Sequence, residues 1–373
     1  MGKTLQKTYS TPTKPFPADE YAGRLKKLTS VLQKEQVSAC FIFTEVNRQY
    51  LSGFESSNGL FLLKPGHKPE FYTDFRYLEP ARKQITFATV KPLKKLDEQF
   101  GPRARKEKWH TVAYEGGLSI GQYDNLRKAI PDIDEWKDCG SWLMNIRSVK
   151  SPREQKIMRQ AIAMNDIAFA KTMEQVKPGM TEWDIRRELR HWGDRLGQEQ
   201  SFAIVCVGSN ASNCHHHPGS RVLKHNQELL IDTGTMVQGY LSDMTRTVFF
   251  GKPSKKMAEI YTIVLQANLK AISIIKAGKS CHDVDTAARS IIEKAGYGKY
   301  FGHGLGHGVG LQIHENPFFS KNNSMKLKPG MIVTVEPGIY LPGIGGVRIE
   351  DMVLVKKNGC EVLTKTPKEL TCY

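Results

Sequence analysis

The sequence predicts an α/β (α+β) chain with a small N-terminal α/β domain over residues 1–145 and a C-terminal domain of two similar halves over residues 146–373. Three observations predict this: the length of 373 residues, a strand and helix alternation early in the chain, and an internal repeat later in it. A chain of this length holds about two domains at roughly 150 residues each. Its 40% hydrophobic and 25% charged residues are typical of a folded globular protein.

Composition also excludes several classes of protein. The 54 Lys and Arg against 38 Asp and Glu give a net charge of +16, which could attract nucleic acid. These basic residues are dispersed and form no RNP or Cys/His finger pattern, so we expect no nucleic-acid partner. No apolar stretch approaches the roughly 20 residues that a membrane span needs, so we expect no membrane insertion. The seven cysteines are scattered without a C-x-x-C pair, which favours a cytoplasmic location.

Short strand-like stretches set the pattern of the N-terminal domain. They alternate with helix-like stretches and cover residues 39–43, 59–63, 70–73 and 87–90. Such an alternation predicts a small α/β domain. The pattern changes after Gly140, and Ser151-Pro-Arg-Glu then combines a cap residue, a proline at the first helical position and an acid in the first turn. We therefore expect a long helix from there and a domain boundary near residue 145.

An internal repeat predicts that the C-terminal domain is duplicated. Residues 176–185 align with residues 275–284 at an offset of 99, and Gly197 and Gly296 keep the same offset. In each copy a helix ends at glycine, and the next helix begins at Thr or Ser with an acid three residues later, close to a capping box. Two such halves, related by a pseudo-twofold axis, would meet at a shared cleft.

Two hairpins each bring a pair of acids together. A four-residue turn at 236–239 would place Asp232 directly opposite Asp243, and a five-residue loop would place Glu336 opposite Glu350. Like charges that face one another destabilise a sheet, and a buried unpaired carboxylate costs several kcal/mol. The flanking residues are apolar, which indicates buried strands and hence a bound cation. Hairpins that face solvent, or a register shifted by one residue, would need no cation.

A glycine-rich segment, residues 301–317, lies between the two hairpins and contains His303, His307 and His314. Its alternate glycines cannot form a stable helix, and they let backbone and ligand approach closely. Imidazole serves as a metal ligand or as a proton carrier near neutral pH. Four carboxylates with one imidazole suit Mn²⁺, Co²⁺, Fe²⁺ or Zn²⁺, and four negative charges balance two divalent ions. The pattern therefore predicts a dinuclear centre for metal-assisted hydrolysis.

Motifs along nearly the whole chain carry a family resemblance. They are the Asp232 to Asp243 segment, Gly-His-Gly-Leu-Gly-His with His-Glu-Asn-Pro, Glu336-Pro-Gly-Ile-Tyr, Gly-Gly-Val-Arg-Ile-Glu350, and Asn47-x-x-Tyr-Leu-Ser-Gly-Phe54 with Thr73-Asp-Phe-Arg-Tyr77. Together they resemble the pita-bread metallopeptidases of family M24, in the proline-directed branch of aminopeptidase P and prolidase. The resemblance implies a creatinase-like N-terminal domain followed by a pita-bread catalytic domain.

The resemblance also implies a set of metal ligands. These would be Asp232, Asp243, His307, Glu336 and Glu350, with Asp243 and Glu350 bridging two ions, for which Mn²⁺ is expected first and Co²⁺, Zn²⁺ or Fe²⁺ are the alternatives. A hydroxide held between the ions would attack the scissile carbonyl, and Glu336 would relay a proton.

The same resemblance assigns roles to further polar residues. His314 would stabilise the oxyanion, and His303 and His215 would position the substrate. His215 is preferred to the two histidines after it, although a run of three histidines is also common in exposed polar loops. Arg348 shares a strand face with Glu350, where it would orient the carboxylate or bind substrate, or form a structural ion pair.

Substrate and partners follow from the resemblance as well. It implies hydrolysis of the Xaa-Pro bond in dipeptides or longer peptides, by a homodimer. Proline offers no N–H to an enzyme, so this bond requires a dedicated cleft. Two other functions remain open: a non-catalytic pita-bread module that binds nucleic acid or protein through its charge, and a metal-free, creatinase-type amidinohydrolase.

Overall fold

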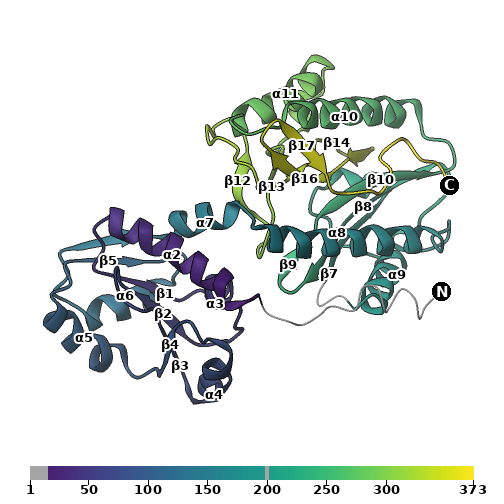
Figure 1. Ribbon diagram of the computed structural model, residues 1–373. Coiled ribbons are helices and arrows are strands. Elements are labelled where there is room, and N and C mark those ends of the chain that lie inside the picture. The colour runs from purple at the N-terminus through teal and green to yellow at the C-terminus, as the bar shows by residue number, and fades with distance from the viewer. Residues whose placement is uncertain (1–15, 198–200) are drawn as a thin grey trace. The chain divides into compact units, whose positions relative to one another are not determined.

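A computed structural model describes residues 16–197 and 201–373 as two compact units that divide between Arg147 and Ser148 (Figure 1). Helix α7 (Gly140–Ser148) contains the predicted boundary at residue 145, two residues before this division. In the described ranges no helix is both long and apolar enough to cross a membrane.

A six-stranded mixed sheet forms the centre of the N-terminal unit. Its strands are β1 (Ala39–Ile42), β2 (Leu60–Leu63), β3 (Glu70–Thr73), β4 (Thr89–Pro92), β5 (Thr111–Tyr114) and β6 (Glu135–Asp138). The strand order is β4-β3-β2-β1-β5-β6, in which the β1-β2 and β2-β3 pairs are antiparallel and the other three pairs are parallel. All four predicted strand-like stretches overlap strands of this sheet.

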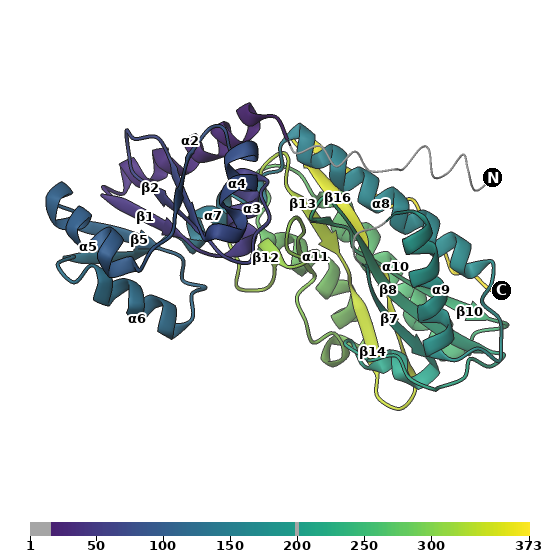
Figure 2. The ribbon, with the colours of Figure 1, turned by 90° about the horizontal axis from the view of Figure 1, so that it is seen from below.

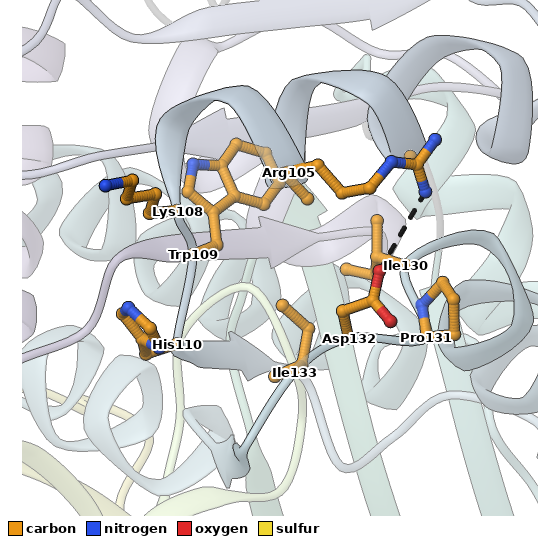
Figure 3. A pocket seen from close by; sticks show the side chains of 10 residues that line it. Arg105, Lys108, Trp109, His110, Ile130, Pro131, Asp132 and Ile133 are labelled. Carbon is orange, nitrogen blue, oxygen red and sulfur yellow. Dashed lines mark ion pairs between the residues drawn. The ribbon is translucent and has the colours of Figure 1, made fainter.

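Among the residues that the structure describes, six helices accompany this sheet. They are α2 (Ala18–Lys34), α3 (Glu45–Ser52), α4 (Phe75–Gln84), α5 (Leu96–Glu107), α6 (Ile120–Ala129) and α7. The unit has its own core, in which Phe41 makes edge-to-face contacts with Phe100 and Trp109. A cavity of about 240 Å³ lies beside α5, and Figure 3 shows Arg105 and Asp132 in its wall, paired at 3.9 Å.

An ion-pair network ties α5 to β3 in this unit. Arg103 donates to both carboxylate oxygens of Glu70, at 2.6 and 3.0 Å, and to Glu107 at 3.0 Å. Burial alone would raise the pKa of Glu70, but the hydrogen bonds from Arg103 and Tyr72 outweigh it and lower this pKa from 4.5 to about 2. The charged form of Glu70 therefore stabilises the folded state.

The C-terminal unit consists of two halves, each with a helix pair followed by strands. The first half holds α8 (Pro152–Met173), α9 (Glu182–Arg195), β7 (Ser201–Val207), β8 (Gln227–Val237), β9 (Tyr240–Leu241) and β10 (Met244–Phe250). The second half holds α10 (Lys255–Ile274), α11 (Cys281–Lys294), β11 (Gly306–Gly308), β12 (Glu315–Phe319), β13 (Ile332–Val335), β14 (Gly338–Leu341), β15 (Gly345–Arg348), β16 (Asp351–Lys356) and β17 (Gly359–Val362). In Figure 1 the strands lie between the two helix pairs.

The strands of this unit form three sheets. The first half orders its strands β10-β8-β7, with β9 paired to β8, and Figure 2 shows β7 and β8 side by side. The second half orders them β12-β11-β13-β16-β17, with β14-β15 as a separate pair. Each half packs its helices on its strands through its own apolar cluster.

The predicted repeat is seen at the N-termini of helices α9 and α11, which are capped in the same way. Thr181 caps α9 and Ser280 caps α11, each in a complete capping box with the acid three residues later. Gly179 and Gly278, two residues before these caps, both take left-handed backbone angles, with φ of +100° and +84°. Helix α8 likewise begins at Pro152 with its capping box, as predicted. The duplicated fold of the C-terminal domain is thereby confirmed.

The first acidic hairpin has a tighter turn than predicted. Val237 pairs with Tyr240, which leaves a two-residue turn at Gln238 and Gly239. Both turn residues have positive φ, +51° and +79°, as a type I′ turn requires. The predicted four-residue turn at 236–239 is therefore wrong.

The tighter turn shifts the pairing of the acids. Asp232 lies opposite Thr245 and not opposite Asp243, as we predicted from the longer turn. The shift is two residues, and side chains alternate with a period of two, so every side chain keeps its predicted face. The two carboxylates consequently share one face as diagonal neighbours.

The second acidic hairpin has the predicted register. The β13-β16 ladder ends one residue before Glu336, and the β14-β15 ladder begins two residues after it, with the register unchanged across the gap. Glu336 therefore lies opposite Glu350. Pro337, which has no N–H to donate, explains the interruption of the ladder. The closing loop is residues 342–344, shorter than the predicted 341–345.

The Glu70 network predicts a pH-dependent stability. Glu70 has a depressed pKa when folded, so its stabilising effect is present above about pH 4.5 and is lost as the pH falls towards 2. The difference in unfolding free energy between wild type and Glu70→Gln should shrink by roughly 1 to 2 kcal/mol between about pH 5 and about pH 3. Urea unfolding at each pH measures this difference, and a difference that is constant with pH would contradict the assignment.

Candidate metal centre

All nine predicted site residues line one cavity of about 1020 Å³ in the C-terminal unit. They are Asp232, Asp243, His307, Glu336, Glu350, His215, His303, His314 and Arg348. They come from β8, β11 and β15, from loops, and from the gap between β13 and β14. The strands of both halves therefore contribute to one site, as the predicted shared cleft requires.

The acids in this cavity lie close together, with Asp243 and Glu350 buried and Asp232 and Glu336 partly buried. One ligand atom from each of Asp243, His307 and Glu350 lies within 4.8 Å of the other two. Burial and the charges of the neighbouring carboxylates raise the pKa of Asp243 and of Glu350 well above their ordinary values. Burial also raises the pKa of Asp232, against the opposing charge of Arg348. The raised pKa values mean that protonation or a bound positive charge stabilises this cluster relative to bare carboxylates.

His307 turns one ring nitrogen towards the acids. Its Nδ1 donates to the carbonyl of Gly308 at 3.1 Å, and its Nε2 lies 3.2 Å from Glu336 Oε1 and 3.7 Å from Asp243 Oδ2. Burial would lower the pKa of His307, but the hydrogen bond and charge of Glu336 raise it. A histidine whose Nδ1 is held by a backbone carbonyl while Nε2 faces carboxylates has the usual orientation of a metal ligand.

The carboxylate cluster passes a direct test for fit to divalent cations. Oδ1 of Asp232 is buried and accepts no hydrogen bond from any residue that the structure describes. The described residues that line the cavity include no lysine and a single arginine, Arg348. One guanidinium therefore accompanies four carboxylates. Buried anionic oxygens without donors are strongly unfavourable, and oxygen donors of this kind are what hard divalent cations bind. The donor set therefore fits such ions.

Arg348 contacts one acid directly and a second through Thr245. Its Nη2 donates to Asp232 Oδ2 at 2.7 Å, and its Nε donates to the Thr245 hydroxyl at 2.9 Å. That hydroxyl donates in turn to Glu350 Oε2 at 2.7 Å. The sequence analysis did not identify Thr245, although its place two residues after Asp243 puts it on the same strand face.

Tyr340 is a second residue that the sequence analysis did not identify. Its hydroxyl accepts from Arg348 Nη1 at 3.2 Å and lies 2.9 Å from Nε2 of His303. Nδ1 of His303 donates to the Gly304 carbonyl at 2.7 Å, and burial lowers the pKa of this histidine. The neutral ring therefore accepts at Nε2 from the Tyr340 hydroxyl. The sequence offered one signal for Tyr340: it lies four residues after Glu336, and alternation along a strand places both side chains on the same face.

His314 and an apolar wall complete the cavity. The His314 ring lies 4.4 Å from the His307 ring, edge to face. Burial, followed by the charge of His307, lowers the pKa of His314, which favours the neutral ring near pH 7. The remaining wall is largely apolar: Phe202, Ile204, Met236, Leu241, Leu311, Ile313 and Phe318.

The structure separates the three consecutive histidines. His215 lines the cavity, whereas His216 Nε2 lies 2.8 Å from Oε2 of Glu182. Glu182 is fully buried at the start of α9 and also accepts from the backbone N–H groups of Val207 and Gly219, at 2.8 and 2.9 Å. His217 is exposed. The loop is therefore held through His216 and Glu182 while His215 faces the cavity.

The fold and the site define a metallopeptidase, and two family models match the chain in succession. Residues 24–149 match the "Creatinase/Prolidase N-terminal domain" and residues 156–357 match "Metallopeptidase family M24". The chain belongs to metallopeptidase family M24, as its motifs predicted. Membership of this family implies divalent metal ions.

Individual relatives match over nearly their whole length. A Xaa-Pro dipeptidase of Pyrococcus furiosus is 34% identical over 93% of this chain and 99% of its own length. Among solved structures, the Xaa-Pro dipeptidase from Bacillus anthracis has a TM-score of 0.89 at 35% identity, covering 95% of this chain and 100% of its own. The X-Pro aminopeptidase from Thermotoga maritima has a TM-score of 0.84 at 32% identity, covering 94% and 99%.

The contacts of the three histidines predict different effects on replacement. His215→Ala should lower kcat/KM for a peptide substrate and leave stability unchanged, because the side chain faces the cavity. His216→Ala should lower the unfolding free energy by about 1 to 3 kcal/mol, because it removes a hydrogen-bond donor from the buried Glu182 carboxylate. Kinetic assays and urea unfolding measure the two effects, with His217→Ala as the matched control. Equal kinetic losses in all three variants would contradict this separation.

Proposed function

We propose that this chain hydrolyses the bond between a first residue and a following proline, in dipeptides and other short peptides. The observation that carries the proposal is the cluster of four carboxylates, two buried and two partly buried, with His307 in the cavity of a family M24 chain. The relatives named Xaa-Pro dipeptidase and X-Pro aminopeptidase, aligned over nearly the full chain, support the choice of bond.

We propose two divalent ions as cofactors, most readily Mn²⁺, with Co²⁺, Zn²⁺ and Fe²⁺ as alternatives. Asp232, Asp243, His307, Glu336 and Glu350 would hold them, with Asp243 and Glu350 shared, because these groups converge and four carboxylates balance two dications. When bound, such ions lower the pKa of water and polarise a carbonyl oxygen.

Glu336 is the group suited to move the proton. The hydrogen bond and charge of His307 outweigh the effect of burial and lower the pKa of Glu336, so the carboxylate is ionised at neutral pH and can accept a proton from the attacking water. The same carboxyl group can then deliver that proton to the proline nitrogen. This delivery is needed because the nitrogen must leave as a neutral amine.

The histidines and Arg348 bind and orient. Neutral His314 can donate one N–H to the oxygen of the scissile carbonyl as negative charge develops there. His303, held by Tyr340, and His215 would position the peptide from the cavity wall. Arg348 holds Asp232 through a bond of 2.7 Å and fixes the direction of its carboxylate.

The two other functions considered from the sequence receive less support. A non-catalytic binding module has no use for four carboxylates that line one cavity, and a metal-free amidinohydrolase would leave their mutual repulsion without compensation. For the proposed peptidase we further infer a cytoplasmic location, from the unpaired cysteines, and a homodimer, from the family resemblance.

Removal of the metal should abolish hydrolysis. Protein treated with a chelator should lose activity on a Xaa-Pro dipeptide, and added Mn²⁺ or Co²⁺ should restore it, because the carboxylates alone cannot activate water. The release of free proline, followed with and without each ion, measures this. A Xaa-Ala dipeptide and creatine are the control substrates, and equal activity on either would contradict the proposed specificity. Activity that persists in metal-free protein would contradict the mechanism.

Neutral variants of the shared ligands should lose more activity than those of other buried acids. Removal of a residue that only orients a metal ligand typically lowers activity by roughly 10- to 100-fold. Asp243→Asn and Glu350→Gln change the ligands themselves and should lower kcat by more than this. Glu228→Gln is the matched control, because Glu228 is also a buried acid of β8 with a pKa raised by burial but does not line the cavity. Steady-state assays and metal analysis measure the effect. Full activity in either ligand variant would refute the assignment of shared ligands.

A further inference from the structure

Glu336 and Glu350 lie where the ladder between their two chain segments is interrupted, and both segments are held there by hydrogen bonds to residues outside that ladder. The N–H of Glu336 donates to the carbonyl of Leu305 at 2.9 Å, and the N–H of Glu350 donates to the carbonyl of Thr245 at 3.1 Å. Neither glutamate lies within a strand, so the ladder alone does not fix their separation. Other groups must therefore set how far apart the two carboxylates lie.

Asn268, at the centre of α10, supplies such a group. It is fully buried, and its Nδ2 donates to the carbonyl of Val335 at 2.9 Å and to the carbonyl of Ile349 at 3.4 Å. These carbonyls belong to the residues immediately before Glu336 and Glu350. One side-chain amide thus connects both backbones at the gap in the ladder.

The orientation of this amide is fixed by Lys368. The Lys368 ammonium donates to Oδ1 of Asn268 at 2.8 Å and to Asp351 at 2.6 Å. An ammonium group can only donate, so the oxygen of Asn268 must face it and the NH₂ must face the two carbonyls. Arg246 holds the other oxygen of Asp351 at 2.7 Å and also donates to the carbonyl of Glu350.

We propose that Asn268 is a positioning residue that sets the spacing of Glu336 and Glu350 and thereby the affinity of the site for its divalent ions. The inference rests on the proposed metal ligands and adds a residue that touches neither ion nor substrate. Asn268 acts through the main chain: without its NH₂ the two carbonyls lose a shared donor, and the strands can separate. Partners that orient metal ligands typically change metal affinity by about 10- to 100-fold when they are removed.

The decisive measurement is the binding of Mn²⁺ to metal-free protein by titration calorimetry, together with the melting temperature of the same samples. Asn268→Leu removes both donors, and Asn268→Asp keeps the size and the oxygen towards Lys368 but has no NH₂. Both variants should bind Mn²⁺ about 10- to 100-fold more weakly than wild type. Lys368→Met, which leaves the donors in place, should weaken binding less. If Asn268→Leu does not fold, Asn268→Asp decides the matter.

Ile260→Ala is the matched control for stability. Ile260 is fully buried in the apolar cluster two turns earlier on α10, so its truncation lowers the melting temperature without removing a donor from Val335 or Ile349. This variant should bind Mn²⁺ as tightly as wild type. Unchanged affinity in both Asn268 variants, or an equal loss in Ile260→Ala, would overturn the inference. Failure of wild type to bind any divalent ion would instead refute the proposed function.

Discussion

The mutual repulsion of four carboxylates, of which Asp243 and Glu350 are buried and Asp232 and Glu336 are partly buried, is the constraint on which the rest of this site depends. Each acid alone would be unfavourable in the interior, and burial with neighbouring charge raises the pKa of Asp232, Asp243 and Glu350. The fold supplies the guanidinium of Arg348 and the imidazole of His307, both in contact with the acids, and it leaves room for cations in the cavity.

The duplicated architecture explains how these acids come together. Each half has its own capped helix pair with an apolar cluster beneath it, and hydrogen bonds such as that from the Glu350 N–H to the Thr245 carbonyl join the strands of the two halves. The cavity forms where strands from the two halves meet, and each half contributes a hairpin that carries two acids. Stability is thereby generated in the two cores, while the unfavourable charges lie between them, where function requires them.

Part of this site was predictable because strands have a simple period. Alternation and register identified the face that the acids share, and the opposition of Glu336 and Glu350 was correct even though their loop is shorter than expected. The first register was wrong because Gln238 and Gly239 both accept positive φ, which closes a two-residue turn. The error did not change the sheet face to which each side chain was assigned, because side chains alternate with a period of two and the shift is two residues.

The remaining contacts could not be predicted because they join residues far apart in the chain. Alternation along β10 and β14 offered a signal for Thr245 and Tyr340. No local pattern indicates that Asn268 lies against the carbonyls of Val335 and Ile349, which is a property of how α10 packs on the strands. Sequence patterns thus predicted the groups with metal-binding chemistry, whereas the groups that orient them depend on tertiary packing.

Protons and metal ions compete for the same oxygens in this cluster. Asp243 and Glu350 have raised pKa values in the folded protein, so without bound cations their contribution to stability is greatest below their unfolded pKa values and declines as the pH rises through the folded ones. A divalent ion that replaces these protons releases them to solvent, so binding of the ion weakens as the pH falls. Metal binding, folding stability and the charge state of the site are therefore one coupled equilibrium, and a residue such as Asn268 that holds the carboxylates together acts on all three at once.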